Sequence, residues 1–174
     1  SRPTTYTFET WIYLPVYGGK NYYIFHTGKK RYSQIFINKE GNLVLYNSNH
    51  KSQAYIPQSE LQRLGFYSGW AYLSVQAKNG SSMSMDNVIV YVNGQQATAK
   101  SSGSGITADM STSRLQLGGY YSNNNVGLPD GSMMKETKIF NAGLASTSAN
   151  RMYTEMNSSS ANWSNLIGYW KQVE

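Results

Sequence analysis

Two tyrosine-rich loops carry the side chains that proteins use to recognise sugars. An aromatic ring covers the C–H face of a pyranose, while amides and hydroxyls bind its hydroxyl groups. One loop joins two tyrosines to three asparagines, and the other places two tyrosines around a pair of glycines. The predicted ligand-binding residues are Tyr120, Tyr121, Asn123, Asn124, Asn125, Tyr17 and Tyr22. The alternative is that these tyrosines pack within their loops and the asparagines only favour turns.

Glycoside hydrolysis needs a different arrangement, with two carboxyl groups flanking one bond. Acidic residues at i, i+2 and i+4 of a strand would project from one face. Neither Glu9 nor Glu136 is followed by an acidic residue at these offsets, and no Glu-x-Asp-x-Glu pattern occurs. No catalytic residue is therefore predicted. Both glutamates are expected to be structural and to pair with Arg or Lys on neighbouring strands.

Metal binding finds little support in the sequence. The chain has no cysteine, and its two histidines, His26 and His50, lack metal-ligand spacing. His26 ends an apolar segment and is expected to be a structural strand residue. Asp130 could offer oxygen ligands to calcium, but Pro129-Asp130-Gly131 is also typical of an ordinary turn. No cofactor and no metal site is predicted, and calcium is a candidate that is not favoured.

The formal net charge is +6, but the positive residues are scattered. One tight cluster, Lys29-Lys30-Arg31, follows an apparent strand. It is typical of a solvated hairpin turn, and the alternative is a contact for an anionic polysaccharide. No recognition helix or aromatic ribonucleoprotein motif accompanies it, so nucleic acid is not an expected partner. No apolar run reaches the roughly 18 residues of a membrane span.

Length and composition indicate one globular domain, residues 1–174, with 40% hydrophobic and 14% charged residues. The chain shows no initiator Met and no signal-peptide core, so we expect an excised module or a processed protein. Three N-glycosylation sequons occur, but eukaryotic extracellular modules usually carry disulfides. We therefore expect a bacterial secreted or surface protein whose sequons arise by chance in Asn- and Ser-rich loops.

Most of the chain shows the patterns of short β-strands separated by turns, and these strands would position the candidate binding residues. Residues 35–37 and 43–46 flank a connection containing Gly41, which predicts a hairpin. Residues 88–92 precede Asn93-Gly94, the dipeptide most typical of a type I′ hairpin.

Several of these strands are apolar on both faces, which fits a sandwich with something packed over its outer side. Three tryptophans lie within strand patterns and are expected in the core: Trp11, Trp70 and Trp170.

One helix is predicted near the C-terminus. Ala149, Met152, Tyr153 and Met156 fall at i, i+3, i+4 and i+7 and would form one apolar face. Ser148 would be its N-cap.

The strand signatures keep a characteristic order along the chain. They are residues 6–14, 69–75, 88–94, 115–119, 137–141 and 166–170. This series resembles the laminin-G-like branch of the concanavalin A-like lectin/glucanase superfamily and covers nearly the whole chain. The resemblance implies an all-β fold, a two-sheet antiparallel jelly-roll β-sandwich with one short helix near the C-terminus.

The resemblance has three further implications. First and last strands would lie close together, and adjacent termini suit a module joined to neighbouring domains of a larger polypeptide. The loop after residues 115–119 would lie near the ligand edge. Relatives often begin the penultimate strand with Asp-Glu, where this chain has Lys135-Glu136. A lysine there removes an oxygen ligand, which argues against calcium.

The function expected from the sequence is non-catalytic carbohydrate binding, with a polysaccharide or glycan as partner. The domain would belong to a secreted or surface-anchored bacterial protein of glycan utilisation or adhesion. The alternative is a structural or protein-interaction module that packs against neighbouring domains, and glycoside hydrolysis ranks third.

Overall fold

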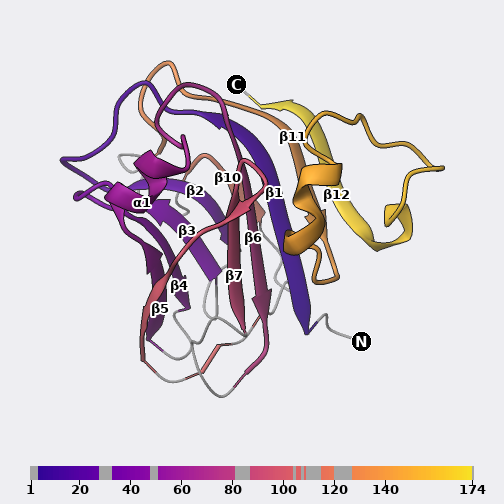
Figure 1. The fold of residues 1–174 in the computed structure, drawn as a ribbon, viewed down its shortest axis with the longest axis horizontal. Helices are drawn as coiled ribbons and strands as arrows, with labels where there is room; N and C mark the ends of the chain where they lie inside the picture. The colour runs from indigo at the N-terminus through magenta and orange to yellow at the C-terminus, as the bar shows by residue number, and fades with distance from the viewer. Residues whose placement is uncertain are drawn as a thin grey trace.

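The computed structural model is a sandwich of two six-stranded antiparallel sheets (Figure 1). It describes residues 4–27, 33–47, 51–80, 87–103, 105–106, 108, 115–119 and 127–173. The predicted two-sheet antiparallel β-sandwich is confirmed. Within these described ranges, no helix has the length and apolar character needed to cross a membrane.

Sheet A has the strand order β12–β11–β1–β6–β7–β8. Its strands are β1 (Thr5–Tyr13), β6 (Ala71–Lys78), β7 (Val88–Val92), β8 (Gln95–Gln96), β11 (Met133–Phe140) and β12 (Leu166–Val173). Strands β1 and β12 both pair with β11, so the first and last strands do lie close together. They run parallel to each other, however, so the start of β1 and the end of β12 lie at opposite ends of the sheet (Figure 1). The expectation of adjacent termini was wrong.

Sheet B has the order β10–β2–β3–β4–β5–β9. Its strands are β2 (Tyr22–Thr27), β3 (Ser33–Ile37), β4 (Leu43–Asn47), β5 (Ser52–Ile56), β9 (Lys100–Ser102) and β10 (Leu115–Leu117). The predicted hairpin between β3 and β4 is confirmed, with Gly41 at φ +83°. The hairpin between β7 and β8 is confirmed too, with Asn93 and Gly94 at φ +52° and +78°.

The hydrophobic core lies between the two sheets. Alternate residues of β1, such as Tyr6, Phe8 and Ile12, point inward and are buried. The rings of Phe8 and Phe25 from opposite sheets approach to 4.6 Å between centroids. Full burial of such side chains contributes roughly 1.5–3 kcal/mol each. Because each strand gives one face to the core, its other residues point to the outside of the sandwich.

The helices differ in detail from the prediction. A short α-helix, α1 (Gln58–Arg63), follows β5 and was not predicted. The C-terminal helix is present as a 3₁₀-helix, η2 (Ala145–Asn150), which begins after Leu144. Ser148 is a buried residue inside it, so its assignment as N-cap was wrong.

The prediction of a buried apolar face for that helix holds for only two of its four residues. Met152 and Met156 are buried, but Ala149 and Tyr153 are exposed. The helix ends before Tyr153, so the 3.6-residue periodicity does not continue through the segment.

A buried ion pair fastens η2 and the segment after it to the outer face of sheet A. Glu9 of β1 is fully buried, and Arg151, directly after η2, is 6% exposed. The Arg151 Nε and Nη2 groups donate to Glu9 Oε2 and Oε1 at 2.9 and 2.5 Å. Arg151 also donates to the Leu144 carbonyl at 2.6 Å and to Thr147 Oγ1 at 2.9 Å. The expectation that Glu9 is a structural, paired carboxylate is confirmed.

Polar groups of sheet A complete this network. The hydroxyls of Tyr72 and Ser74 donate to the Glu9 carboxylate at 2.7 and 3.1 Å. Lys138 is buried beside them and donates to Tyr72 Oη at 3.3 Å. Burial, followed by the Glu9 charge, raises the pKa of Tyr72 well above its usual value, while burial lowers the pKa of Lys138. Because every member has a partner, the carboxylate is stabilised despite its removal from water.

Replacement of Arg151 by Ala should therefore be strongly destabilising, because it leaves the Glu9 carboxylate buried without its counter-ion. Breaking a buried ion pair typically costs about 3–5 kcal/mol. The matched control is Lys171→Ala, since Lys171 pairs with Glu155 and both side chains are largely exposed. Exposed pairs contribute little because water screens them. Urea unfolding of both variants measures the difference, and equal effects would contradict the anchoring role.

Candidate functional site

The outer face of sheet B presents two parallel rows of side chains, which we call the aromatic–amide face. Each row follows directly paired residues from strand to strand. The aromatic row is Tyr23, Phe36, Val44, Tyr55 and Lys100. The polar row is Gln116, His26, Gln34, Tyr46, Gln53 and Ser102. None of these residues belongs to the core cluster between the sheets.

An irregularity in β2 brings both rows onto the same face. Tyr23 pairs with Phe36 and His26 with Gln34, and the register of the β2–β3 ladder shifts between Tyr23 and Phe25. Ile24 and Phe25 consequently both enter the core. A regular strand would have placed Tyr23 and His26 on opposite faces, because they are three residues apart.

The aromatic row offers rings that are held in place but not fully covered. The rings of Tyr23 and Phe36 stack with centroids 4.8 Å apart, and both are half-buried. Tyr55 is also half-buried and pairs with Val44 and Lys100. Such side chains have lost most of their rotamer freedom before any ligand arrives, which reduces the entropic cost of binding.

The polar row offers neutral hydrogen-bonding groups. Gln116 Oε1 is buried and accepts no hydrogen bond from any residue that the structure describes. His26 is 3% exposed, and burial lowers its pKa, so its imidazole is neutral at pH 7. Val44, Gln34 and His26 are buried, so the surface that a ligand can reach comes from the half-buried members of the two rows: Tyr23, Phe36, Tyr55, Tyr46 and Gln53. These side chains can cover apolar ring faces and bind hydroxyls, which is the chemistry of an uncharged sugar.

Most of the predicted ligand residues lie outside the described part of the chain. They are Tyr120, Tyr121, Asn123, Asn124 and Asn125. The cluster Lys29-Lys30-Arg31 and His50 lie outside it as well. These assignments stay predictions.

The structure does describe both ends of the loop that carries the tyrosine–asparagine run. The Gly118 amide donates to the Ile24 carbonyl at 2.8 Å, and the Leu128 amide donates to Gly118 O at 3.1 Å. The loop therefore leaves sheet B directly beside Tyr23. A cavity of about 290 Å³ lies at its base and is lined by Leu117, Leu128 and Asp130 among others.

The two predicted tyrosines of the other loop lie close together in sequence but differ in environment. Tyr22 is buried, and its hydroxyl donates to Gly18 O at 3.4 Å. The Tyr17 ring stacks on Tyr67, with centroids 3.7 Å apart, and its hydroxyl accepts from Gln62 at 3.3 Å. Neither residue belongs to the aromatic–amide face, and their role in binding stays a prediction.

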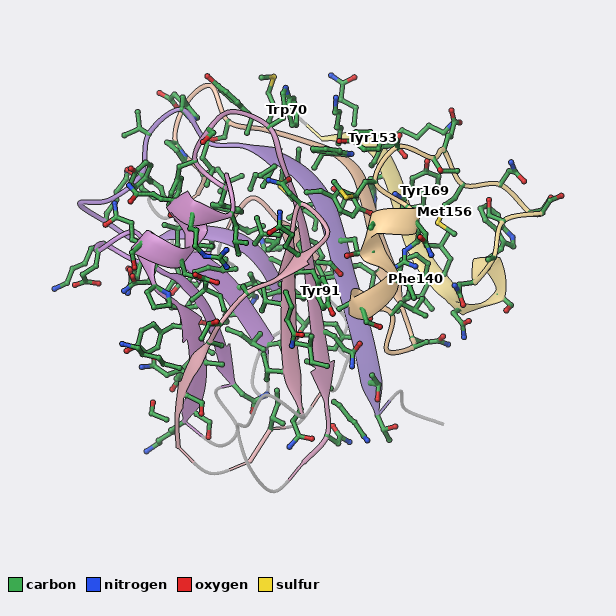
Figure 2. All side chains as sticks on the ribbon, in the orientation of Figure 1. Trp70, Tyr91, Phe140, Tyr153, Met156 and Tyr169 are labelled. Carbon is green, nitrogen blue, oxygen red and sulfur yellow. The ribbon has the colours of Figure 1, made fainter. Side chains whose placement is uncertain are left out.

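A second surface feature, the tryptophan pocket, lies on the outside of sheet A. It is a cavity of about 460 Å³ lined by Trp11, Trp70, Lys135, Glu136, Met152, Tyr153, Thr154 and Glu155. Trp70 is 37% exposed and Tyr153 is 86% exposed. Figure 2 shows both near the same edge of the molecule.

The expectation that Trp70 and Trp170 are core residues was wrong, since both are exposed. Trp70 precedes β6 rather than lying within it, so strand alternation does not direct its side chain inward. Trp170 lies on β12, an edge strand of sheet A. Trp11, also expected in the core, does not belong to it either: it is half-buried on the outer face, where its indole N–H donates to Met152 O at 2.6 Å.

The carboxylates are not arranged for glycoside hydrolysis within the described residues. Glu9 is buried and engaged by Arg151, and the Tyr169 hydroxyl donates to Glu136. Tyr169, rather than Arg or Lys, is the hydrogen-bond partner of Glu136, so that part of the pairing prediction was wrong. Burial and this hydrogen bond raise the pKa of Tyr169 to about 12.

Across the described ranges, no group of three or more His, Asp and Glu side chains could hold a metal ion. Lys135, the residue that argued against calcium in the sequence, places its ammonium 4.4 Å from the centroid of the Trp70 ring. Asp130 lies in the predicted Pro129-Asp130-Gly131 turn, closed by a hydrogen bond from the Ser132 amide to Pro129 O.

Comparison with known proteins finds similarity in structure alone, since no family model and no curated protein matches this sequence. A proposed carbohydrate-binding protein from Bacteroides ovatus superposes with a TM-score of 0.65 at 14% identity, covering 98% of this chain and 46% of that one. The CBM40 domain of Ruminococcus gnavus IT-sialidase, bound to α2,3-sialyllactose, superposes with a TM-score of 0.56 at 11% sequence identity. The match covers 87% of this chain and 83% of that one.

Domains LG4-5 of the mouse laminin α1 chain give a TM-score of 0.53 at 13% identity, covering 79% of this chain and 35% of that one. This chain therefore spans less than half the length of two of these matched structures. At these identities the matches show the fold alone, and that fold also includes glucanases. The chain has the concanavalin A-like, laminin-G-like jelly-roll fold that its strand order predicted.

Proposed function

We propose that this domain is a non-catalytic carbohydrate-binding module that binds an uncharged oligosaccharide along the aromatic–amide face. The observation that carries the proposal is the pair of rows, one aromatic and one polar, on the same strands. A sugar chain lying across the strands would place ring faces on one row and hydroxyls against the other.

The dimensions of the face favour a chain of sugars over a single unit. The aromatic row crosses five strands from Tyr23 to Lys100. With strands about 4.8 Å apart, the row is roughly 19 Å long. Because the side chains are mounted on a hydrogen-bonded sheet, the surface is preorganised for a rigid ligand.

The predicted loop residues fit the same proposal. The loop carrying Tyr120, Tyr121 and the asparagines leaves sheet B beside Tyr23, at one end of the aromatic row. We propose that it adds further aromatic and amide contacts there. We also propose that residues 1–174 form one domain of a bacterial secreted or cell-surface protein.

The fold comparisons support binding over catalysis, since the Bacteroides and Ruminococcus matches are a proposed carbohydrate-binding protein and a sialyllactose-bound module. Glycoside hydrolysis is not supported by the glutamates of sheet A. Glu9 is enclosed with Arg151, so substrate has no access to its carboxylate.

One observation favours the second candidate, a module that packs against neighbouring domains. The edge strand β12 exposes Ile167 and Trp170, and Met133 on adjacent β11 is exposed too. Exposed apolar side chains on an edge strand are typical of interaction surfaces. This role concerns sheet A and is compatible with glycan binding on sheet B.

Replacement of Tyr55 by Ala should weaken glycan binding about ten- to a hundred-fold. By analogy with bases stacked on aromatic side chains, loss of one stacked ring costs about 1–3 kcal/mol. Gln53→Ala should cost less, about 1 kcal/mol for one hydrogen bond. A glycan array selects the ligand, and isothermal titration calorimetry then measures affinity.

Tyr91→Ala is the matched control, because Tyr91 is a half-buried tyrosine on the outer face of sheet A (Figure 2). It should leave affinity unchanged. A folded Tyr55→Ala domain that binds like the parent would refute the placement on this face. Binding that collapses with added salt would instead indicate an anionic ligand.

Tyr120→Ala and Tyr121→Ala should give unequal results if the loop contributes. One ring would stack on the sugar and its loss would lower affinity at least tenfold, while the other would pack inward and its loss would lower the melting temperature. Calorimetry and thermal melts on the same samples separate the two effects. Two variants that bind like the parent would exclude the loop from the site.

A further inference from the structure

We propose that the tryptophan pocket is a second sugar-binding site, specific for a single uncharged pyranose unit. Its volume of about 460 Å³ falls within the range of small-ligand sites. It lies on the outside of sheet A, whereas the aromatic–amide face lies on the outside of sheet B. The two sites therefore share no residue, and binding at the pocket does not depend on the proposed function of the face.

Three aromatic rings form the walls of the pocket. The Trp11 ring lies 5.6 Å from that of Tyr153, at an interplanar angle of 44°. Trp70 contributes a third ring, packed on Tyr13 at 6.0 Å. Tyr153 is the most exposed large apolar or aromatic side chain named above, at 86%, which leaves ring surface available for a sugar.

The walls are also held in place without a ligand. The indole N–H of Trp11 donates to Met152 O, one residue before Tyr153. Arg151, the residue before Met152, is fixed by its buried ion pair with Glu9. The segment that carries Tyr153 is thus anchored at two consecutive residues, Arg151 and Met152. The conformational entropy lost when a ligand binds is therefore small.

The charged side chains that line the pocket, Lys135, Glu136 and Glu155, each already have an interaction partner, which selects against charged ligands. Glu136 accepts from Tyr169, and Glu155 is paired with Lys171. The Lys135 ammonium lies over the Trp70 ring at 4.4 Å, where a cationic ligand would otherwise bind. A cation would have to displace Lys135 from the face of the Trp70 ring, and an anion would meet both carboxylates.

An uncharged ligand with several hydroxyls fits this arrangement. Ammonium groups donate and carboxylates accept hydrogen bonds, so a pyranose can use both at once. Its C–H face would stack on Tyr153, and the two indoles would enclose it. A domain with one such site and one extended face on opposite sides could hold two glycan chains together.

Indole N–H resonances provide a direct test, since the chain has four tryptophans and none lies on the aromatic–amide face. The intact domain is titrated with the methyl glycosides of glucose, galactose, mannose and N-acetylglucosamine. At least one should shift the Trp11 and Trp70 signals saturably and leave those of Trp163 and Trp170 in place. Tyr153→Ala should weaken this binding at least tenfold, and Tyr55→Ala should leave it unchanged.

Tyr153→Ala is the primary variant because an 86% exposed side chain can be removed without unfolding the domain. Trp70→Ala is the second. The proposal is overturned if none of the four glycosides shifts Trp11 and Trp70 at tens of millimolar. It is also overturned if Tyr153→Ala binds like the parent, or if tetramethylammonium or glucuronate binds more tightly than every uncharged glycoside. Loss of binding in Tyr55→Ala would show that the shifts report the face on sheet B instead.

Discussion

The buried pair of Glu9 and Arg151 determines how the two outer faces of the sandwich differ. It lies in the middle of sheet A and draws η2 and the following segment onto that sheet. Helix η2 packs on this sheet, and the residues directly after it supply Met152 and Tyr153 to the tryptophan pocket. Sheet B carries no such helix in the described chain, and Tyr23, Phe36, Tyr46, Gln53 and Tyr55 of its outer rows are half-buried, whereas His26, Gln34 and Val44 are buried. Burial of two charges is costly, and the surrounding hydroxyls, carbonyls and Lys138 make it tolerable.

The two candidate sites follow from different physical constraints. The aromatic–amide face depends on strand register, because a one-residue slip would exchange its rows with core residues. The irregularity in β2 is therefore as important as the side chains themselves, since it brings His26 into the polar row. The tryptophan pocket depends on tertiary anchoring instead. Its walls come from β1, from the residue before β6, from β11 and from the segment after η2.

Strand order and hairpin chemistry made the fold predictable from sequence, since turns such as Asn93-Gly94 act locally. The face was harder to predict, because its members belong to six strands and are brought together only by pairing. Alternation in residues 52–56 places Gln53 and Tyr55 on one face, which was a usable signal. Trp70 and Trp170 were wrongly predicted as core residues, because a large apolar residue in or beside a strand pattern is most often buried. A C-terminal helix was predicted, but its bounds and its 3₁₀ type were not, because periodicity does not reveal where a short helix ends.

Mapping a bound oligosaccharide onto backbone amides by NMR tests the central claim most directly, namely that sheet B carries the glycan. With the strongest ligand from the array, the account predicts that the largest shift changes fall on β2, β3, β4 and β5, around Tyr23, Gln34 and Tyr55. Changes should extend into the loop after β10. Shift changes confined to β1, β6 and β11, with sheet B unaffected, would contradict it.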